Sequence, residues 1–334
     1  MQRTQALQDW LARLFPAQQW RIEAASADAS FRRYFRVFFA DGSASRIVMD
    51  APPQQENCVP FIRVAGLLRQ AGLNAPEVLA QDLDQGYLLL TDLGSTTYLA
   101  ALRADAGTAD ALFRDAIDAL IAWQLASRPD VLPVYDRALL RRELDLFPEW
   151  YLARHLNLAL APEQRLELER MFALILESNL AQPRVYVHRD YMPRNLMLAQ
   201  PNPGVLDFQD AVYGPISYDL ASLLRDAFIS WEEERALDWI VRYWEKARRA
   251  GLPVGDDFGD FYRDLEWMGL QRHLKVLGIF ARIRYRDGKP AYLEDAPRFV
   301  GYVRAVAARY NALAPLVHLF DAIGMQPANQ GKTS

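Results

Sequence analysis

The 334-residue sequence has one cysteine and no long apolar run. Because Cys58 stands alone, no disulfide can form within the chain, and nothing requires an oxidising compartment. No segment approaches the roughly 18 uninterrupted apolar residues of a membrane span. The first residues, MQRTQALQDWLARLF, form a charged amphipathic pattern instead of the apolar run of a signal peptide. We therefore expect a cytoplasmic protein with no membrane association.

An excess of positive charge is also missing. The net charge of −4 gives no general attraction for nucleic acid, which usually binds a basic face. Of the 38 basic residues only four are lysines, at positions 246, 275, 289 and 332, so the first 245 residues contain none. The chain is long enough for two lobes, and its composition, 51% hydrophobic and 24% charged, is that of a globular protein.

Strand patterns dominate the first quarter of the chain. Residues 19–50 contain RYFRVFF and SRIVMDA, which are rich in β-branched and aromatic residues and are separated by an Asp-Gly hairpin signal. A helix is predicted at 57–72, where apolar residues recur at helical spacing before a glycine. Short strands are predicted at 77–80 and 86–91.

From about residue 92 the pattern becomes mostly helical. Helices are predicted at 108–126, 137–156, 162–180, 216–229, 231–250, 256–284 and 295–320, and short strands at 185–187 and 204–207. The sequence thus predicts an α+β protein with two lobes. We expect a small β-rich N-lobe (1–91), a large helical C-lobe (92–324) and a loose tail (325–334).

The stretch VYVHRDYMPRNLML places His188, Asp190 and Asn195 between two short apolar segments, and Asp207 opens DFQD after the second. Phosphoryl transfer from ATP to a hydroxyl needs a carboxylate that orients the hydroxyl and oxygen ligands that hold Mg²⁺. The alternative is a polar turn whose side chains bond their own backbone, with a core histidine beside it. The whole set favours a phosphotransfer loop.

HRDYMPRN followed by DFQD resembles the catalytic and metal loops of the protein-kinase-like superfamily. The resemblance implies a protein-kinase-like two-lobed fold that uses ATP and Mg²⁺. It implies that Asp190 is the catalytic base and that Asn195 and Asp207 bind the metal. It also implies that residues 86–93, which include Leu90 and Asp92, form a hinge that holds adenine.

Spacing argues against a protein kinase. Asp219 follows Asp207 after only twelve residues, which leaves no room for an activation segment and its APE motif. YGPISYDLASLL is similar to a segment of the aminoglycoside phosphotransferase family. This resemblance implies that Asp219, with His188, supports the catalytic loop structurally. HRD where that family often has HGD is a departure, and Arg189 is expected to be structural.

The N-lobe departs from the family pattern because Met49 stands near the position of the ATP-gripping lysine. We predict that arginines act on the phosphates instead, because a guanidinium matches phosphate oxygens. Arg32 and Arg33 are the candidates, and solvent-facing strand residues are the alternative reading. The nearby small-residue loop from Ser26 to Ser30 is the candidate phosphate loop. The missing lysine also leaves open a pseudokinase, a binding module without catalysis.

Nearly the whole chain is similar to the bacterial sugar kinases that phosphorylate the anomeric hydroxyl of N-acetylmuramate and N-acetylglucosamine. The similarity lies in RRYFRV, IVMDAPP, LLLTDLG, LFPEWYL, HRDYMPRNLM, DFQDAVYGPISYDLASLLRD and QRHLKVLGIFARI. It implies an amino-sugar substrate, a sugar 1-phosphate product and a role in peptidoglycan recycling. No obligatory protein partner is evident. An aminoglycoside or choline-type kinase remains the alternative among small-molecule kinases.

Candidates for sugar binding come from two stretches and from Arg194 in HRDYMPRN. The basic stretch 271–289 could meet the carboxylate of muramate. A solvated helix face is the alternative reading of that stretch. The segment ELDLFPEW supplies an acidic residue and a tryptophan whose flat face could stack on a sugar. The substrate-binding candidates are Glu149, Trp150, Arg194, Arg272, His273 and Lys275.

Overall fold

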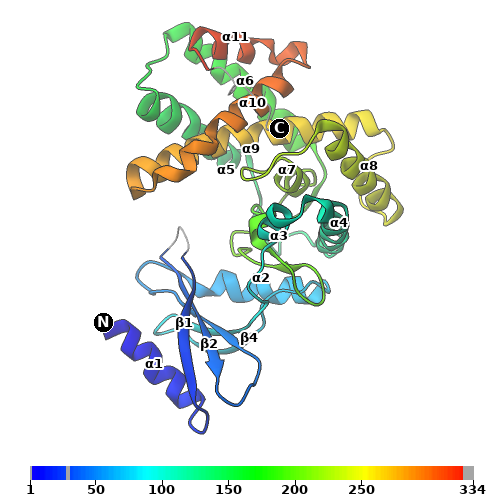
Figure 1. Ribbon diagram of the computed structural model, residues 1–334. Coiled ribbons are helices and arrows are strands. Elements are labelled where there is room, and N and C mark those ends of the chain that lie inside the picture. Colours follow the sequence, from blue (N-terminus) through cyan, green and yellow to red (C-terminus); the bar gives the residue numbers. More distant parts are fainter. Residues whose placement is uncertain (1, 28–30, 326–334) are drawn as a thin grey trace. The chain divides into compact units, whose positions relative to one another are not determined.

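The computed structural model describes residues 2–27 and 31–325. The chain forms two compact units. Unit 1 consists of Met1–Ala122 and Arg194–Asp210, and unit 2 of Trp123–Pro193 and Ala211–Ser334. Their elements are labelled in Figure 1.

Unit 1 is built on a five-stranded antiparallel sheet with the order β1-β2-β3-β5-β4. Its elements are α1 (Gln2–Leu14), β1 (Trp20–Ala27), β2 (Arg33–Phe39), β3 (Arg46–Asp50), α2 (Cys58–Gln70), β4 (Val78–Asp82) and β5 (Tyr87–Thr91). Side chains alternate between the two faces of a strand. Val37, Val48 and Leu89 therefore share one face, where they pack with Leu7 and Leu11 of α1 in a hydrophobic core.

The opposite face of the sheet carries a second row of side chains. Arg36 lies opposite Ile47, which lies opposite Leu90, so one row crosses β2, β3 and β5. The same alternation places Tyr34 and Met49 on this face. Residues an even number of positions apart on a strand therefore share a face, and only those on this second face can contact a ligand bound there.

A small hairpin far along the chain belongs to unit 1. Its strands are β7 (Leu196–Met197) and β8 (Gly204–Val205), which pair antiparallel. The Val205 amide donates to the Asn74 carbonyl over 2.8 Å, and the Leu198 amide donates to the Thr96 carbonyl over 2.9 Å. The unit also contains α3 (Tyr98–Ala104), the 3₁₀ turn η1 (Ala106–Thr108) and α4 (Ala109–Leu125), which ends in unit 2.

Unit 2 is mainly helical (Figure 1). Its elements are α5 (Arg137–Leu146), the π-helical segment η2 (Phe147–His155), α6 (Pro162–Ala181), β6 (Arg184–Val187), β9 (Val212–Pro215), α7 (Tyr218–Leu224), α8 (Glu233–Arg249), α9 (Phe258–Asp287), α10 (Ala296–Ala307) and α11 (Ala314–Ala322), with 3₁₀ turns η3 (Pro193–Asn195, split between the units), η4 (Pro290–Asp295) and η5 (Asn311–Leu313). α9 contacts α5, η2, α6, α7 and α10, so its middle is buried on all sides. None of the helices within residues 2–27 and 31–325 is long and apolar enough to cross a membrane.

The predicted strands and helices occur in the predicted order, but the sequence analysis did not predict α3, β7 or β9. Other differences concern the limits of the predicted elements. The predicted helix 295–320 is two helices, α10 and α11, separated by a 3₁₀ turn. The predicted helix 137–156 changes to π-helical geometry at Phe147. The sheet ends at Thr91, whereas the compact unit 1 continues to Ala122 and includes the β7–β8 hairpin, so the predicted lobe boundary at residue 91 stays a prediction. Residues 326–334 of the predicted tail lie outside the described residues.

The packing of α9 depends on Gly278. A Cβ added there would lie 2.4 Å from the backbone of Leu146, which cannot move aside as a flexible side chain could. We expect Gly278→Ala to destabilise the protein by about 1–3 kcal/mol in a denaturant titration, the usual cost of overpacking. Gly66→Ala in α2 is the matched control, because a Cβ there meets nothing within 4 Å. It should stabilise the helix by about 0.5–1 kcal/mol. Destabilisation by both changes to the same extent would contradict the packing account.

Candidate active site

The β7–β8 hairpin brings the two predicted metal ligands together in unit 1. Asn195 ends the 3₁₀ turn before β7, and Asp207 follows β8 after one residue. The Leu206 amide donates to the Asn195 carbonyl over 3.0 Å, and Asn195 Nδ2 donates to Asp207 Oδ2 over 3.2 Å. Asp207 has a left-handed backbone, with φ of +63°, a conformation that aspartate tolerates better than most residues. The two side chains can therefore present oxygens to one ion.

A cavity of about 300 Å³ lies between the second face of the sheet and this hairpin. That volume falls in the range of small-ligand sites. The predicted residues that line the cavity are Leu90, Asp92, Arg194, Asn195 and Asp207. Thr91 and Leu93 of the predicted hinge also line it. Further lining residues that the sequence analysis did not identify include Tyr34, Arg36, Ile47 and Phe61. The residues predicted to form the hinge and to bind the metal thus line one cavity.

Asp92 has its carboxylate fully occupied by protein donors. Arg36 binds it with two nitrogens, over 2.6 and 3.1 Å, while the Ser45 hydroxyl and the Gly94 amide donate over 2.7 and 2.9 Å. Burial opposes ionisation, but these hydrogen bonds hold the pKa of Asp92 below its ordinary value. Asp92 therefore fixes the chain after β5, whose residues line the cavity. The alternation of side chains along β2 could have indicated that Arg36 lies on the same face of the sheet as Tyr34.

The two candidate arginines lie on different sides. Arg33 pairs with Asp50, which also binds Arg3 of α1 over 2.7 Å, so Arg33 belongs to the α1 face. The prediction that Arg33 faces the phosphates is wrong, because strand alternation turns it away from the cavity.

Arg32 is also not among the residues that line the cavity, so its role at the phosphates stays a prediction. It pairs with Glu56 over 2.9 Å. Burial lowers its pKa, but the negative field of Tyr34, Glu56, Asp210 and Asp207 outweighs burial and raises it. Arg32 thus lies within the field of Asp207, a predicted metal ligand. Ser26 belongs to β1, and Ser30 lies outside the described residues.

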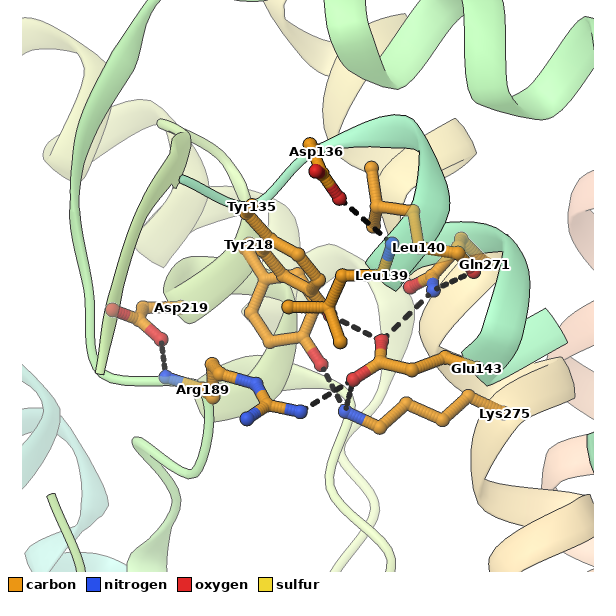
Figure 2. A network of polar contacts seen from close by, with 10 residues as sticks. All are labelled: Tyr135, Asp136, Leu139, Leu140, Glu143, Arg189, Tyr218, Asp219, Gln271 and Lys275. Carbon is orange, nitrogen blue, oxygen red and sulfur yellow. Dashed lines mark hydrogen bonds and ion pairs between the residues drawn. The ribbon is translucent and has the colours of Figure 1, made fainter. Parts of the chain in front are cut away.

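In unit 2 the segment that follows β6 carries Asp190. Asp219, at the start of α7, accepts from the backbone amide of Arg189 over 3.0 Å (Figure 2). It also accepts from the backbone amide of His188 over 2.6 Å. The buried His188 ring accepts from the Asp190 amide at Nδ1 over 3.2 Å. Arg189 adopts a left-handed φ of +77°, which is uncommon for this residue type. Asp219 and His188 thus make the kind of contacts that their predicted supporting roles require. Burial raises the pKa of Asp219 to about 7.

The side chain of Arg189 enters a buried polar network (Figure 2). Its guanidinium binds Glu143 of α5, and the Lys275 ammonium of α9 binds the same carboxylate over 2.9 Å. Burial alone would raise the pKa of Glu143, but the charges of Lys275 and Arg189 overcome it and lower the pKa to about 2. Arg189 is structural, as predicted, and its partner is Glu143.

The predicted sugar-binding residues of α9 are interior side chains. Arg272, His273 and Lys275 are 3%, 0% and 7% exposed, so both the basic face and its solvated alternative are wrong at these positions. The cause is the central place of α9, which is covered by other helices on every side.

Glu149 is exposed on η2 and lines a separate cavity of about 470 Å³ in unit 2, while Trp150 is half-buried.

The low pKa of Glu143 predicts a contribution to acid stability. Its ordinary pKa is 4.5, so the contribution is complete above that pH and is lost as the pH falls towards 2. In Glu143→Gln this loss should disappear. The melting temperature of the variant should therefore fall less steeply than that of the wild type between pH 4.5 and 2. Equal slopes would show that Glu143 is not held ionised in the fold.

The chain is similar to known proteins in sequence and in fold. The sequence model of the phosphotransferase enzyme family (APH) matches residues 21–256. The chain is 54% identical to the N-acetylmuramate/N-acetylglucosamine kinase of Pseudomonas aeruginosa, over 96% of this chain and 97% of that protein. It is 52% identical to the protein of the same name from Neisseria meningitidis serogroup B, over 100% of both chains.

Among solved structures, a choline/ethanolamine kinase family protein from Mesorhizobium loti superposes with a TM-score of 0.63. The match covers 97% of this chain and 99% of that chain at 14% identity, which is evidence for the fold alone. The predicted protein-kinase-like fold is confirmed. Because the family model spans more than half of the chain and near-full-length relatives share over half of its residues, the chain belongs to the phosphotransferase enzyme family.

Proposed function

We propose that this protein is an ATP-dependent kinase that phosphorylates the anomeric hydroxyl of N-acetylmuramate and N-acetylglucosamine. The observation that carries the proposal is the 52–54% identity, over nearly the whole chain, to kinases named for these two sugars. The product is a sugar 1-phosphate, which can enter nucleotide-sugar synthesis in the recycling of peptidoglycan. In this proposal the enzyme works in the cytoplasm, where ATP is available.

Asp190 is the proposed catalytic base. Its carboxylate orients the anomeric hydroxyl and accepts its proton as the oxygen–phosphorus bond forms and the bond to the ADP leaving group breaks. An anomeric hydroxyl is more acidic than an ordinary alcohol, so a carboxylate is a sufficient acceptor. Asp219 and His188 keep Asp190 in place through the backbone of the loop.

Asn195 and Asp207 are the proposed Mg²⁺ ligands. An amide oxygen and a carboxylate match the preference of this ion, which usually takes one or two protein carboxylates together with phosphate oxygens and water. Two protein ligands suit an ion that takes its other oxygens from the nucleotide and from water. When bound, Mg²⁺ neutralises charge on the transferred phosphoryl group.

The 300 Å³ cavity of unit 1 is the proposed nucleotide site. The backbone around Leu90 holds the base, and Asp92 with Arg36 keeps this segment in position. Arg32 takes the place of the missing lysine, held by Glu56 near the phosphate end.

Arg32→Met is therefore expected to raise the KM for ATP about tenfold, the loss of one charge-assisted hydrogen bond at about 1.4 kcal/mol. Arg33→Met is the matched control, because its partner Asp50 lies on the α1 face. Initial rates at varied ATP concentration give the KM for ATP of both variants. A larger effect for Arg33→Met would reverse the assignment of the two arginines.

The test of the proposed function is a turnover screen with ATP. The acceptors are N-acetylmuramate, N-acetylglucosamine, an aminoglycoside and choline. We expect ADP release with the two amino sugars and loss of the reducing end in the product. Turnover with only the aminoglycoside or choline would favour the other kinase classes, and no turnover with any acceptor would favour a pseudokinase.

A further inference from the structure

We propose that Glu143 is a positioning residue for the catalytic loop: it holds Arg189, the neighbour of Asp190, and Lys275 ties the same carboxylate to α9. The inference rests on the proposed function, in which Asp190 is the base. It concerns a residue of α5 that lies far from the catalytic motif in the sequence. Figure 2 shows the network from close by.

The loop is held at Arg189 from two sides. Asp219 accepts from its backbone amide over 3.0 Å, and Glu143 binds its guanidinium. The guanidinium also lies over the Tyr135 ring, 5.6 Å from its centre. Since Arg189 has a left-handed backbone next to Asp190, release of its side chain should let the loop relax and displace the Asp190 carboxylate.

Glu143 is suited to this task because both of its oxygens are occupied. Oε1 binds the two cations, Arg189 and Lys275, while Oε2 accepts from the Tyr135 hydroxyl and from Gln271 Nε2 over 3.2 Å. Lys275 also donates to the Tyr218 hydroxyl over 3.0 Å. With an exposed fraction of 5%, the carboxylate has a single orientation and cannot exchange its partners for water.

The charges in this network do not cancel in pairs. Glu143 binds both buried cations directly, and Asp190 attracts them from further away, so loss of Glu143 would leave an excess of positive charge at Arg189 and Lys275. The repulsion would displace the Arg189 side chain and, with it, the loop that carries Asp190. It should affect turnover more than nucleotide binding, because no residue of the network lines the cavity of unit 1.

The first experiment is steady-state kinetics of Glu143→Gln. We expect kcat to fall on the order of 100-fold, the cost of a misplacement of about 1 Å, with the KM for ATP unchanged. Adding Lys275→Met removes one of the two uncompensated cations. The double variant Glu143→Gln/Lys275→Met should therefore recover about tenfold in kcat over Glu143→Gln alone, the effect of about 1.4 kcal/mol. A double variant that is no better than the single one overturns the charge argument.

Glu266→Gln is the matched control. Glu266 is also buried, at 2% exposed, and also binds an arginine and a tyrosine, Arg309 and Tyr310. It should keep the wild-type kcat. If kcat falls equally in Glu266→Gln and Glu143→Gln, the effect of Glu143 is general destabilisation and the proposal is wrong.

Two further measurements keep the test decisive. Arg189→Met leaves a balanced pair of Glu143 and Lys275, so it should fold and should still lose kcat like Glu143→Gln. Hydrogen exchange of the His188 and Arg189 amides should speed up in both variants, and this readout needs no sugar turnover. Unchanged exchange overturns the inference even if the wild type phosphorylates amino sugars. Faster exchange in a protein that phosphorylates no sugar would support Glu143 as a loop anchor and contradict the proposed function.

Discussion

Asp190→Asn is expected to lower kcat about 10²–10⁴-fold, the usual contribution of a positioned acid or base. The KM for ATP should stay near the wild-type value, because Asp190 is not among the residues that line the unit 1 cavity. An amide still fits the loop, where the Asp190 backbone amide donates to His188, but it cannot accept the proton of the sugar hydroxyl. Coupled measurement of ADP release with N-acetylmuramate gives both constants.

Asp257→Asn is the control for this variant. Asp257 is the N-cap of α9 and accepts from the Asp260 amide over 2.9 Å, a role that asparagine fills about equally well. It should leave kcat unchanged. A kcat for Asp190→Asn within a few-fold of the control would remove Asp190 from the role of base.

Asp207→Asn is expected to lower kcat about 10²–10³-fold and to raise the Mg²⁺ concentration needed for half-maximal rate. Asp207 is the carboxylate of the pair that lines the cavity, and its loss leaves two amides in place of a charge for the ion. Gln209 and Asn195 would still be able to hydrogen-bond the new side chain, so the fold should be retained.

The measurement is a Mg²⁺ titration of initial rate at saturating ATP and sugar. Asp84→Asn, an exposed substitution in the turn between β4 and β5, is the control. Equal Mg²⁺ dependence in Asp207→Asn and wild type would contradict the assignment of Asp207 as a ligand.

The parts of the site that could be predicted from sequence depend on short-range spacing. Asn195 and Asp207 flank a hairpin, so local pairing of β7 and β8 is sufficient to bring them together. Asp219 lies twelve residues after Asp207, and its carboxylate accepts from two backbone amides of the loop that carries Asp190. The alternation of apolar residues also predicts the strands and most helices, because it follows directly from which face each element buries.

The rest depends on packing between distant segments. Arg33 and Arg36 look alike in RRYFRV, and only the position of α1 on one face of the sheet distinguishes them. The charges of α9 resemble an exposed basic face until α5, α7 and α10 cover it. Glu143 and Lys275 are 132 positions apart, and no local pattern indicates that they form a pair. Buried ion pairs of this kind violate the usual rule that charges lie outside.

The position of the phosphate on the product tests the central claim most directly. Wild-type protein, ATP, Mg²⁺ and N-acetylmuramate are incubated, and the product is examined by phosphorus NMR and by a reducing-sugar assay. We predict a sugar 1-phosphate in amounts equal to the ADP formed, without a reducing end, and product formation by Asp190→Asn that is slower by about 10²–10⁴-fold. A phosphorylated sugar that keeps its reducing end would contradict anomeric transfer.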